Sequence, residues 1–453
     1  MKHVFAGIFV FLLTLSVVVW ILKPRADYAG KTELVWVSDD NPGRRVQIAL
    51  FNELHPDYHL RLDPASSGMA KLIVQSIAGV GPDLFDCHSG FELSAFVTAG
   101  IAWDLTDAMA AEDINVKNDT WAATHTTCLY EGRVYGFPRN AGADAVFYNK
   151  NLFKAAGVEL PPRFIRNEEF LRLAKVLTIT DGNGRVQQYG FLFSWGQYPH
   201  FLRQWDAHIY SESGTVCVLD RPEAIAAIQY MHDLIWKHRV SPTPQQEAAM
   251  ATAGGWGSGA ITLFGGGRAA MALGGRWWLC TLRNKSSFPN LELGVTECQF
   301  GPVRQYHGYC GVVMINRNSP KRQDAIAFLK YMASGPYNNL INHQADALCP
   351  VKKYAETDEF LHDPVFPEET YNDVWREVLK HSVPGEVSPF INGNTASRII
   401  TEQLDLIKTN LKSPSDGLRT ATQQIDREIQ RTLERDPVLR EKYDKLIAKE
   451  GAP

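Results

Sequence analysis

Residues 134–153 constrain the fold of this chain more than any other stretch. Two short apolar runs, 134–137 and 145–148, flank a break that contains proline, asparagine and glycine. Apolar runs bounded by turn-forming residues predict strands, and Asn149 before the next apolar run predicts the start of a helix. Two extended strands joined by a short break could carry a long chain from one lobe into another. We therefore expect a two-lobed protein whose function lies in the cleft between the lobes.

Length and composition agree with two globular domains. A chain of 453 residues exceeds one ordinary hydrophobic core. An apolar content of 45% with 21% charged residues is typical of globular proteins and not of disordered or fibrous ones. The formal net charge of -4, without any long run of lysine and arginine, argues against a nucleic-acid partner.

The N-terminus carries an apolar segment, 4–22, that contains no charged residue. Its length suits a membrane-spanning helix better than the shorter apolar core of a secretory signal. No clear pair of small residues at the cleavage spacing follows it, and no cysteine before Cys87 is present to carry a lipid. We expect residues 1–30 to be an uncleaved signal anchor, with a cleaved signal peptide as the alternative. Either would export residues 31–453 to the periplasm or to the outer face of the cytoplasmic membrane.

The seven cysteines are scattered along the chain, without a C-x-x-C pair and without a cysteine–histidine cluster at the spacing of a zinc site. This pattern argues against zinc. Cys298 and Cys310 are the nearest pair and could form a disulfide after export, although buried thiols without a reactive role are the favoured interpretation. We expect neither a metal nor a cofactor.

Strand and helix patterns alternate in the first part of the exported chain. Short apolar runs that predict strands are followed by amphipathic runs that predict helices. The strands are expected at 34–37, 58–62 and 81–86, and the helices at 44–55, 69–78 and 91–99. This order predicts an α/β fold with a parallel sheet. Ligands of such sheets collect beyond the carboxyl ends of the strands.

The rest of the chain is expected to form a second lobe and to return to the first. Helices are predicted at 168–177, 222–238, 264–271, 323–333, 374–380, 396–411 and 418–433, and strands at 189–193 and 310–316. We assign residues 31–140 and about 303–340 to lobe 1. Residues 141–302 and about 341–440 are assigned to lobe 2.

Five segments, taken together and in order, resemble one protein family. They are AGVGPDLFD at 78–86; YGFP at 135–138 with YNK at 148–150; the run from Phe264 to Trp277; AIAFLK at 325–330; and LCPVK at 348–352. Their order and spacing are similar to those of extracellular solute-binding proteins of ABC importers, in the sugar-binding group that includes maltose-binding protein. The resemblance extends over nearly all of the exported chain.

The resemblance implies a periplasmic-binding-protein-like fold of two lobes with crossing strands, preceded here by one N-terminal hydrophobic helix. It implies a monomer that closes around a carbohydrate at a hinge and delivers it to the transmembrane subunits of an ABC permease, with no catalytic residue. Two alternatives stay open: a membrane-anchored ligand sensor with the same fold, and a carbohydrate-active enzyme. No sequence signature of a glycosidase supports the enzyme.

The strongest site candidates come from the strand ends and from this resemblance. Trp277 matches the family's tryptophan that stacks on a sugar ring, and Gly275 would let the backbone approach the ligand. Asp39 follows the first strand and could accept hydrogen bonds from sugar hydroxyls, with a turn or helix-cap role as the alternative. Trp36 lies in that strand, where a core position is the alternative.

The remaining candidates lie at other strand ends, in the break, and in glycine-containing loops. They are Ser67, Gly68, Asp86 and His88; Arg139 and Asn140; and Trp195 and Trp256. Asp86 has helix capping as its alternative, His88 a solvated role, and Arg139 and Asn140 a scaffolding role in the hinge. Arg139 would suit sugar hydroxyls or the carboxylate of a uronate. Trp256, in a glycine-rich run, is expected to cover the ligand as a lid.

Overall fold

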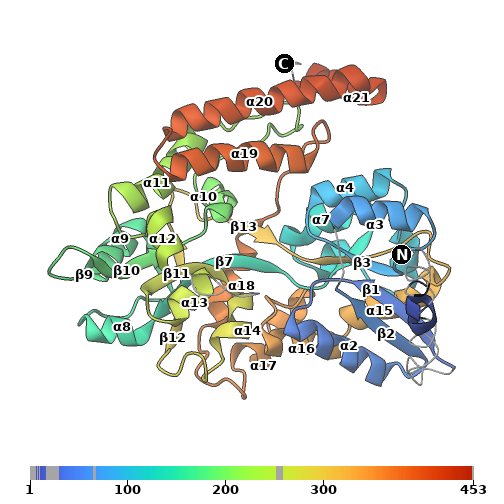
Figure 1. The fold of residues 1–453 in the computed structure, drawn as a ribbon, viewed down its shortest axis with the longest axis horizontal. Coiled ribbons are helices and arrows are strands. Elements are labelled where there is room, and N and C mark those ends of the chain that lie inside the picture. Colours follow the sequence, from blue (N-terminus) through green and yellow to red (C-terminus); the bar gives the residue numbers. More distant parts are fainter. Residues whose placement is uncertain are drawn as a thin grey trace.

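The computed structural model describes residues 7, 9, 11–16, 30–64, 68–250 and 259–450. Two β-sheets form the centres of two bodies that lie side by side, with the C-terminal helices across one end (Figure 1). We call the body around the five-stranded sheet lobe 1 and the body around the eight-stranded sheet lobe 2. The predicted α/β fold with two lobes is confirmed.

Lobe 1 contains a mixed sheet of five strands. Across the sheet these are β2 (Tyr58–Asp63), β1 (Thr32–Val37), β3 (Leu84–Cys87), β14 (Val312–Ile315) and β6 (Gly136–Pro138). The first three strands are parallel, whereas β14 runs antiparallel to both β3 and β6. The parallel strands arise because each is followed by a helix that crosses back over the sheet, as the alternating sequence pattern predicts.

Helices cover both faces of this sheet. They are α2 (Pro42–Leu54), α3 (Gly68–Ile77), α4 (Gly90–Thr98), α15 (Arg322–Ala333) and α16 (Gly335–Gln344). In Figure 1, α3 and α4 lie on one side of the strands and α2 and α16 on the other. Short elements then lead to β6: α5 (Thr106–Ala111), α6 (Val116–Asp119), α7 (His125–Cys128), β4 (Leu129–Tyr130) and β5 (Arg133–Val134).

Lobe 2 contains eight strands arranged around β7. Six of them follow the order β15 (Ser382–Val383), β13 (Tyr306–Tyr309), β7 (Gly142–Asn149), β11 (Ala269–Gly275), β10 (Val186–Leu192) and β9 (Ile179–Thr180). The other two are β12 (Leu293–Gln299), which pairs with β7, and β8 (Phe164–Arg166), which pairs with β12. Nearly every residue of β7 and β11 is buried, as expected for central strands that are covered on both faces.

The helices of lobe 2 pack on this sheet or extend beyond it. Those before the return to lobe 1 are α8 (Lys150–Ala155), α9 (Asn167–Val176), α10 (Tyr198–Gln204), α11 (Pro222–Trp236), α12 (Pro244–Met250), α13 (Ala260–Gly265) and α14 (Leu279–Leu282). Those near the C-terminus are α17 (Asp358–Leu361), α18 (Asn372–Lys380), α19 (Gly393–Lys408), α20 (Pro414–Arg435) and α21 (Pro437–Glu450). Helix α18 packs on β7 and β12, and α20 packs on α11.

Three chain segments join the lobes and are hydrogen-bonded to one another. In the first, the backbone N–H of Arg139 donates to the carbonyl of Gly311 in the second, at 2.8 Å. Ala141 exchanges two backbone hydrogen bonds with Leu348 in the third segment, at 2.9 and 2.8 Å. The break between runs 134–137 and 145–148 therefore links the lobes as expected, the predicted strand 310–316 lies at the return to lobe 1, and the segment around Leu348 adds a third link. We call these three segments the hinge.

One predicted helix is wrong. The run 264–271 was expected to be helical, yet helix α13 ends at Gly265 and Ala269 begins strand β11. Gly267 has a φ of +73°, a left-handed conformation that favours glycine and ends the helix. The following alanines are fully buried between β7 and β10, so tertiary pairing overrides their helix propensity.

The structure also bears on the predicted disulfide and N-terminal helix. Cys298 and Cys310 are both buried free thiols, so the disulfide considered for them is not formed. Within the described part of the chain, no helix combines the length and the apolar composition needed to span a bilayer. Most of the apolar segment 4–22 lies outside the described residues.

Candidate ligand cleft

Three adjoining cavities lie between the lobes. The lobe-2 cavity, about 620 Å³, is lined by Trp277 and Tyr309. The lobe-1 cavity, about 290 Å³, is lined by Asp39 and His88. The bridging cavity, about 330 Å³, shares His88 with the lobe-1 cavity and Tyr309 with the lobe-2 cavity. The three cavities together, which we call the cleft, form one region bounded by both lobes.

On the lobe-1 side, Asp39 is held in place by two arginines. Its Oδ1 atom accepts from Nε of Arg44 at 3.0 Å and from Nη2 of Arg139 at 3.3 Å. The Asp39 side chain is 37% exposed, whereas those of Arg44 and Arg139 are only 1% and 6% exposed. Among the described residues, no donor contacts its Oδ2 atom. Asp39 thus presents one fixed, available carboxylate oxygen to the cleft.

Behind Asp39 the two guanidinium groups face two further carboxylates. Arg139 lies 3.4 Å from Asp86 and 3.7 Å from Asp346, and Arg44 lies 2.5 Å from Asp346. All four of these side chains are buried. Three carboxylates therefore surround two guanidinium groups. One negative charge is left over, and Asp39 is the most exposed of the acids.

The Arg139 guanidinium requires a glycine beside it. A Cβ atom on Gly311 would lie 2.3 Å from Nε of Arg139 and 2.5 Å from its Cζ, distances that real Cβ atoms do not reach. Only glycine at this position of the second hinge segment leaves room for the side chain. The hinge backbone and the carboxylate cluster are therefore packed directly against each other.

Trp36 supports Asp86 and does not face the cleft. Its indole Nε1 donates to Oδ1 of Asp86 at 2.8 Å, and the hydroxyl of Ser38 donates to Oδ2 at 2.6 Å. Burial nevertheless raises the pKa of Asp86 to about 6. The Trp36 ring is fully buried and packs on Phe328 at 5.1 Å. The prediction of Trp36 as a ligand contact is thus corrected, because no face of the ring is accessible.

On the lobe-2 side, Trp277 and Tyr309 line the largest of the three cavities. Trp277 follows the end of β11 and is half-buried. The Tyr309 hydroxyl donates to Asp144 at 3.1 Å, and Gln197 donates to the same carboxyl group at 2.8 Å. A Cβ atom on Gly275 would lie 2.0 Å from the Tyr309 hydroxyl and 2.6 Å from the Trp277 ring. Gly275 therefore allows both aromatic side chains to lie against the strand end.

The neighbouring tryptophan has a structural role. Trp278 is buried and stacks on Phe147, with ring centroids 5.7 Å apart and planes 7° from parallel. Of the two adjacent tryptophans, Trp278 is therefore the one that packs inside lobe 2.

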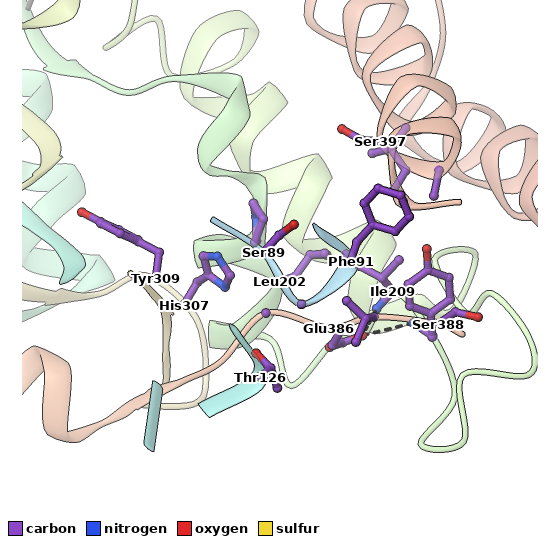
Figure 2. A pocket seen from close by; sticks show the side chains of 18 of the residues that line it. Ser89, Phe91, Thr126, Leu202, Ile209, His307, Tyr309, Glu386, Ser388 and Ser397 are labelled. Atoms are coloured by element: carbon purple, nitrogen blue, oxygen red, sulfur yellow. Dashed lines mark hydrogen bonds between the residues drawn. The ribbon is translucent and has the colours of Figure 1, made fainter. Parts of the chain in front are cut away.

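The bridging cavity brings side chains of both lobes together (Figure 2). Ser89 and Phe91 come from the start of α4 in lobe 1, and His307 and Tyr309 come from β13 in lobe 2. Burial, with a contribution from Arg203, lowers the pKa of His307 to about 4, so its ring is neutral at physiological pH.

The other predicted site residues occupy different positions. Gly68 and His88 line the lobe-1 cavity. Asn140 is buried in the hinge, where its amide oxygen accepts from the backbone N–H of Gly311 at 2.9 Å. Trp195 packs beside Phe193 in lobe 2 and does not line the cleft, although Gly196 does. Ser67 and Trp256 lie outside the described residues.

The capping roles considered for Asp39 and Asp86 belong to other residues. Asn41 caps α2 by accepting from the N–H of Gly43, and Ser89 caps α4 by accepting from the N–H of Glu92. Both aspartates are therefore available for the carboxylate cluster.

Sequence reasoning missed four residues of the cleft and its support: Asp144, Tyr309, Arg44 and Asp346. Asp144 carried a usable signal, since a single carboxylate inside an otherwise apolar strand is unusual. Arg44 and Asp346 carried no such signal, because they are 302 residues apart in the sequence and meet only in the fold.

Two solved structures with a similar fold have a bound carbohydrate in their titles. An ABC substrate-binding protein from Listeria monocytogenes, in complex with cycloalternan, superposes with a TM-score of 0.73 at 20% identity; the match covers 88% of this chain and 99% of that one. A maltose/maltodextrin-binding domain from Bdellovibrio bacteriovorus, bound to maltotriose, gives a TM-score of 0.68 at 17% identity, with 88% and 100% covered.

Two proteins related in sequence match shorter stretches of this chain than the solved structures do. An uncharacterized ABC transporter extracellular-binding protein from Pyrococcus horikoshii is 25% identical over 115 residues, which are 24% of this chain and 25% of the relative. The melibiose/raffinose/stachyose-binding protein of Bacillus subtilis is 27% identical over 173 residues, 36% of this chain and 37% of the relative. The chain thus matches well under half the length of these two relatives.

A family model matches about two thirds of the chain. The model for bacterial extracellular solute-binding proteins matches residues 38–337. This range includes Asp39 and Asp86 at the ends of β1 and β3, the first two hinge segments and Trp277. The chain belongs to the family of bacterial extracellular solute-binding proteins.

Proposed function

We propose that this protein is the substrate-binding component of an ABC-type carbohydrate importer. It would bind a sugar or oligosaccharide in the cleft, close by rotation about the hinge, and present the closed form to a membrane permease. Membership of a solute-binding family supports binding without chemical change of the ligand. The family description also supports an exported location, in the periplasm or on the outer face of the cytoplasmic membrane.

One observation carries the proposal: an aromatic face and a fixed carboxylate oxygen line the same cleft from opposite lobes. Trp277 can cover the apolar C–H face of a sugar ring, while Asp39 accepts hydrogen bonds from its hydroxyls. A ligand that contacts both residues would bridge the two lobes and so favour a closed form.

The dimensions of the cleft support an oligosaccharide. The lobe-2 cavity alone, about 620 Å³, falls within the range of about 300–1,000 Å³ that is usual for small-molecule sites. Two further cavities extend it toward lobe 1 and toward α19. The carbohydrates named in the titles of structural neighbours, cycloalternan and maltotriose, are oligosaccharides too.

The domain limits proposed from the sequence need one refinement. β13 pairs with β7 in the lobe-2 sheet, whereas α16 packs on α2 and α15 in lobe 1. We therefore propose that lobe 1 resumes at β14 and includes α16, and that lobe 2 resumes after the third hinge segment.

The test is calorimetry of the full-length chain, in detergent, against a panel of neutral oligosaccharides. Loss of the Trp277 face should weaken binding by about 2 kcal/mol, or roughly 30-fold. Trp277→Ala is compared with Trp236→Ala, since Trp236 is also half-buried in lobe 2 but bonds to Lys408 away from the cleft. Equal affinity of the two variants would show that Trp277 does not contact the ligand. Appearance of a cleaved product would favour an enzyme.

The apolar segment 4–22 keeps the sensor as a second candidate, since an anchored binding protein could report to a signalling partner. Co-purification of the full-length chain from native membranes distinguishes the two. Recovery of permease subunits supports the importer, and recovery of a membrane kinase supports the sensor.

A further inference from the structure

The ionisable side chains that line the cleft are mostly acidic. Across the three cavities the described lining contains one arginine, Arg203, and no lysine. The carboxylates in the same lining are Asp39, Asp86, Glu92, Asp144, Glu247 and Glu386. The two internal segments outside the described residues, 65–67 and 251–258, contain no ionisable side chain.

The single arginine is already committed to protein groups. Arg203 is 8% exposed, lies 2.5 Å from Glu386 and donates to the carbonyl of Pro384 at 2.9 Å. Arg44 and Arg139 are likewise paired with the three carboxylates behind Asp39 and are nearly inaccessible. None of the three guanidinium groups is therefore available to a bound anion.

The histidines of the cleft do not supply the missing positive charge. Burial lowers the pKa of His200 to about 3 and that of His307 to about 4, so both are neutral at physiological pH. His88 is 52% exposed, and its Nε2 lies 3.9 Å from Oδ2 of Asp86, so the ring lies beside a carboxylate.

We infer that the cleft selects its saccharide by charge: it takes neutral or amine-bearing sugars and excludes those that carry carboxylate, sulfate or phosphate groups. This inference rests on the proposed function and names the substrate class of the same site. The free Oδ2 atom of Asp39 can accept equally from a hydroxyl or an ammonium group. A uronate beside it would meet a like charge with no counter-ion in the wall. Arg139, which the sequence offered as a uronate ligand, is occupied by Asp39 and Asp86.

The test compares oligosaccharides of three charge classes on the full-length chain. Neutral malto-oligosaccharides and cello-oligosaccharides, glucosamine oligomers and galacturonate oligomers are titrated by calorimetry. Ionic strengths of about 0.01 M and 0.15 M set the Debye length near 30 and 8 Å. We expect the tightest ligand to be neutral or amine-bearing and galacturonate oligomers to bind at least about tenfold more weakly. The affinity of amine-bearing ligands should fall as the ionic strength rises.

Asp39→Asn provides the second measurement. Removing the surplus charge should reduce the difference in affinity between amine-bearing and uronate ligands. Asp40→Asn should leave this difference unchanged, because Asp40 pairs with Arg45 at the exposed surface. A galacturonate oligomer as the tightest ligand would overturn the charge selection but leave the carbohydrate importer standing. Absence of binding by every oligosaccharide of the panel would instead overturn the proposed function.

Discussion

The amide oxygen of Asn140 accepts a hydrogen bond from the backbone N–H of Gly311 at 2.9 Å, and so ties the first hinge segment to the second. Next to it, the guanidinium of Arg139 lies against Gly311 and reaches the carboxylate of Asp39. The hinge and the lobe-1 wall are thus one packed unit. A change in the backbone of either segment will be transmitted to the orientation of Asp39.

Gly311→Ala should destabilise the protein. The new Cβ atom would lie 2.3 Å from Nε of Arg139, which must move away from Asp86 and Asp346. Moving one partner out of a buried ion pair leaves the other charge buried without compensation, which costs about 3–5 kcal/mol of stability. Urea unfolding measures the change in the free energy of unfolding. The control is Gly182→Ala, where no atom lies within 4 Å of the new Cβ; equal stability of the two variants would contradict the argument.

Gly275→Ala should weaken ligand binding more than it affects folding. Its Cβ atom would overlap the Tyr309 hydroxyl and the Trp277 ring, so both side chains must leave their positions on the cleft wall. We expect about a tenfold or greater loss of affinity, since a displaced aromatic side chain loses its contact area. Gly196→Ala is the matched control. It lines the same cavity, but its Cβ atom would make only an ordinary 3.5 Å contact with Ser194. An equal loss in both variants would show that added bulk alone is responsible.

The parts of the cleft that follow strand ends were predictable from sequence. Asp39 and Asp86 were found because parallel strands place their carboxyl ends at one edge of a sheet. The position of Tyr309 depends on the pairing of β13 with β7, which joins Tyr309 to Gly142. No local pattern encodes such a register. Trp36 was misassigned for a related reason, because strand alternation does not show that Phe328 of α15, far away in the sequence, packs on its ring.

His307 should make the protein less stable as pH falls. Its pKa is lowered to about 4 in the folded chain, against about 6.5 for an unperturbed histidine. Below about pH 6.5 the unfolded chain binds a proton that the folded chain does not. This stabilising contribution is complete above that pH and is lost at up to about 1.4 kcal/mol per pH unit on acidification.

Urea unfolding of wild type and His307→Gln between about pH 7 and pH 5 measures this effect. The stability advantage of wild type over the variant should shrink by about 2 kcal/mol across that range. Because wild type and variant are compared at the same pH, the opposing contribution of Asp86 cancels. The raised pKa of Asp86 favours the folded state as pH falls. The control is His362→Gln at an exposed position. Parallel pH profiles for wild type and His307→Gln would show that His307 is not protonated on unfolding.

Phe91→Ala should weaken closure of the lobes. Phe91 projects from the start of α4 in lobe 1 onto Gly393 at the start of α19 in lobe 2 (Figure 2), where a Cβ atom on Gly393 would lie 2.4 Å from its ring. Losing this half-buried ring removes apolar contact between the lobes worth about 1–2 kcal/mol, so ligand affinity should fall about 5–30-fold.

Calorimetry measures the affinity, and small-angle X-ray scattering should show a larger radius of gyration in the variant. Phe366→Ala is the control, because Phe366 is also half-buried but packs under Arg283. Unchanged affinity and radius in Phe91→Ala would mean that this contact does not contribute to the closed form.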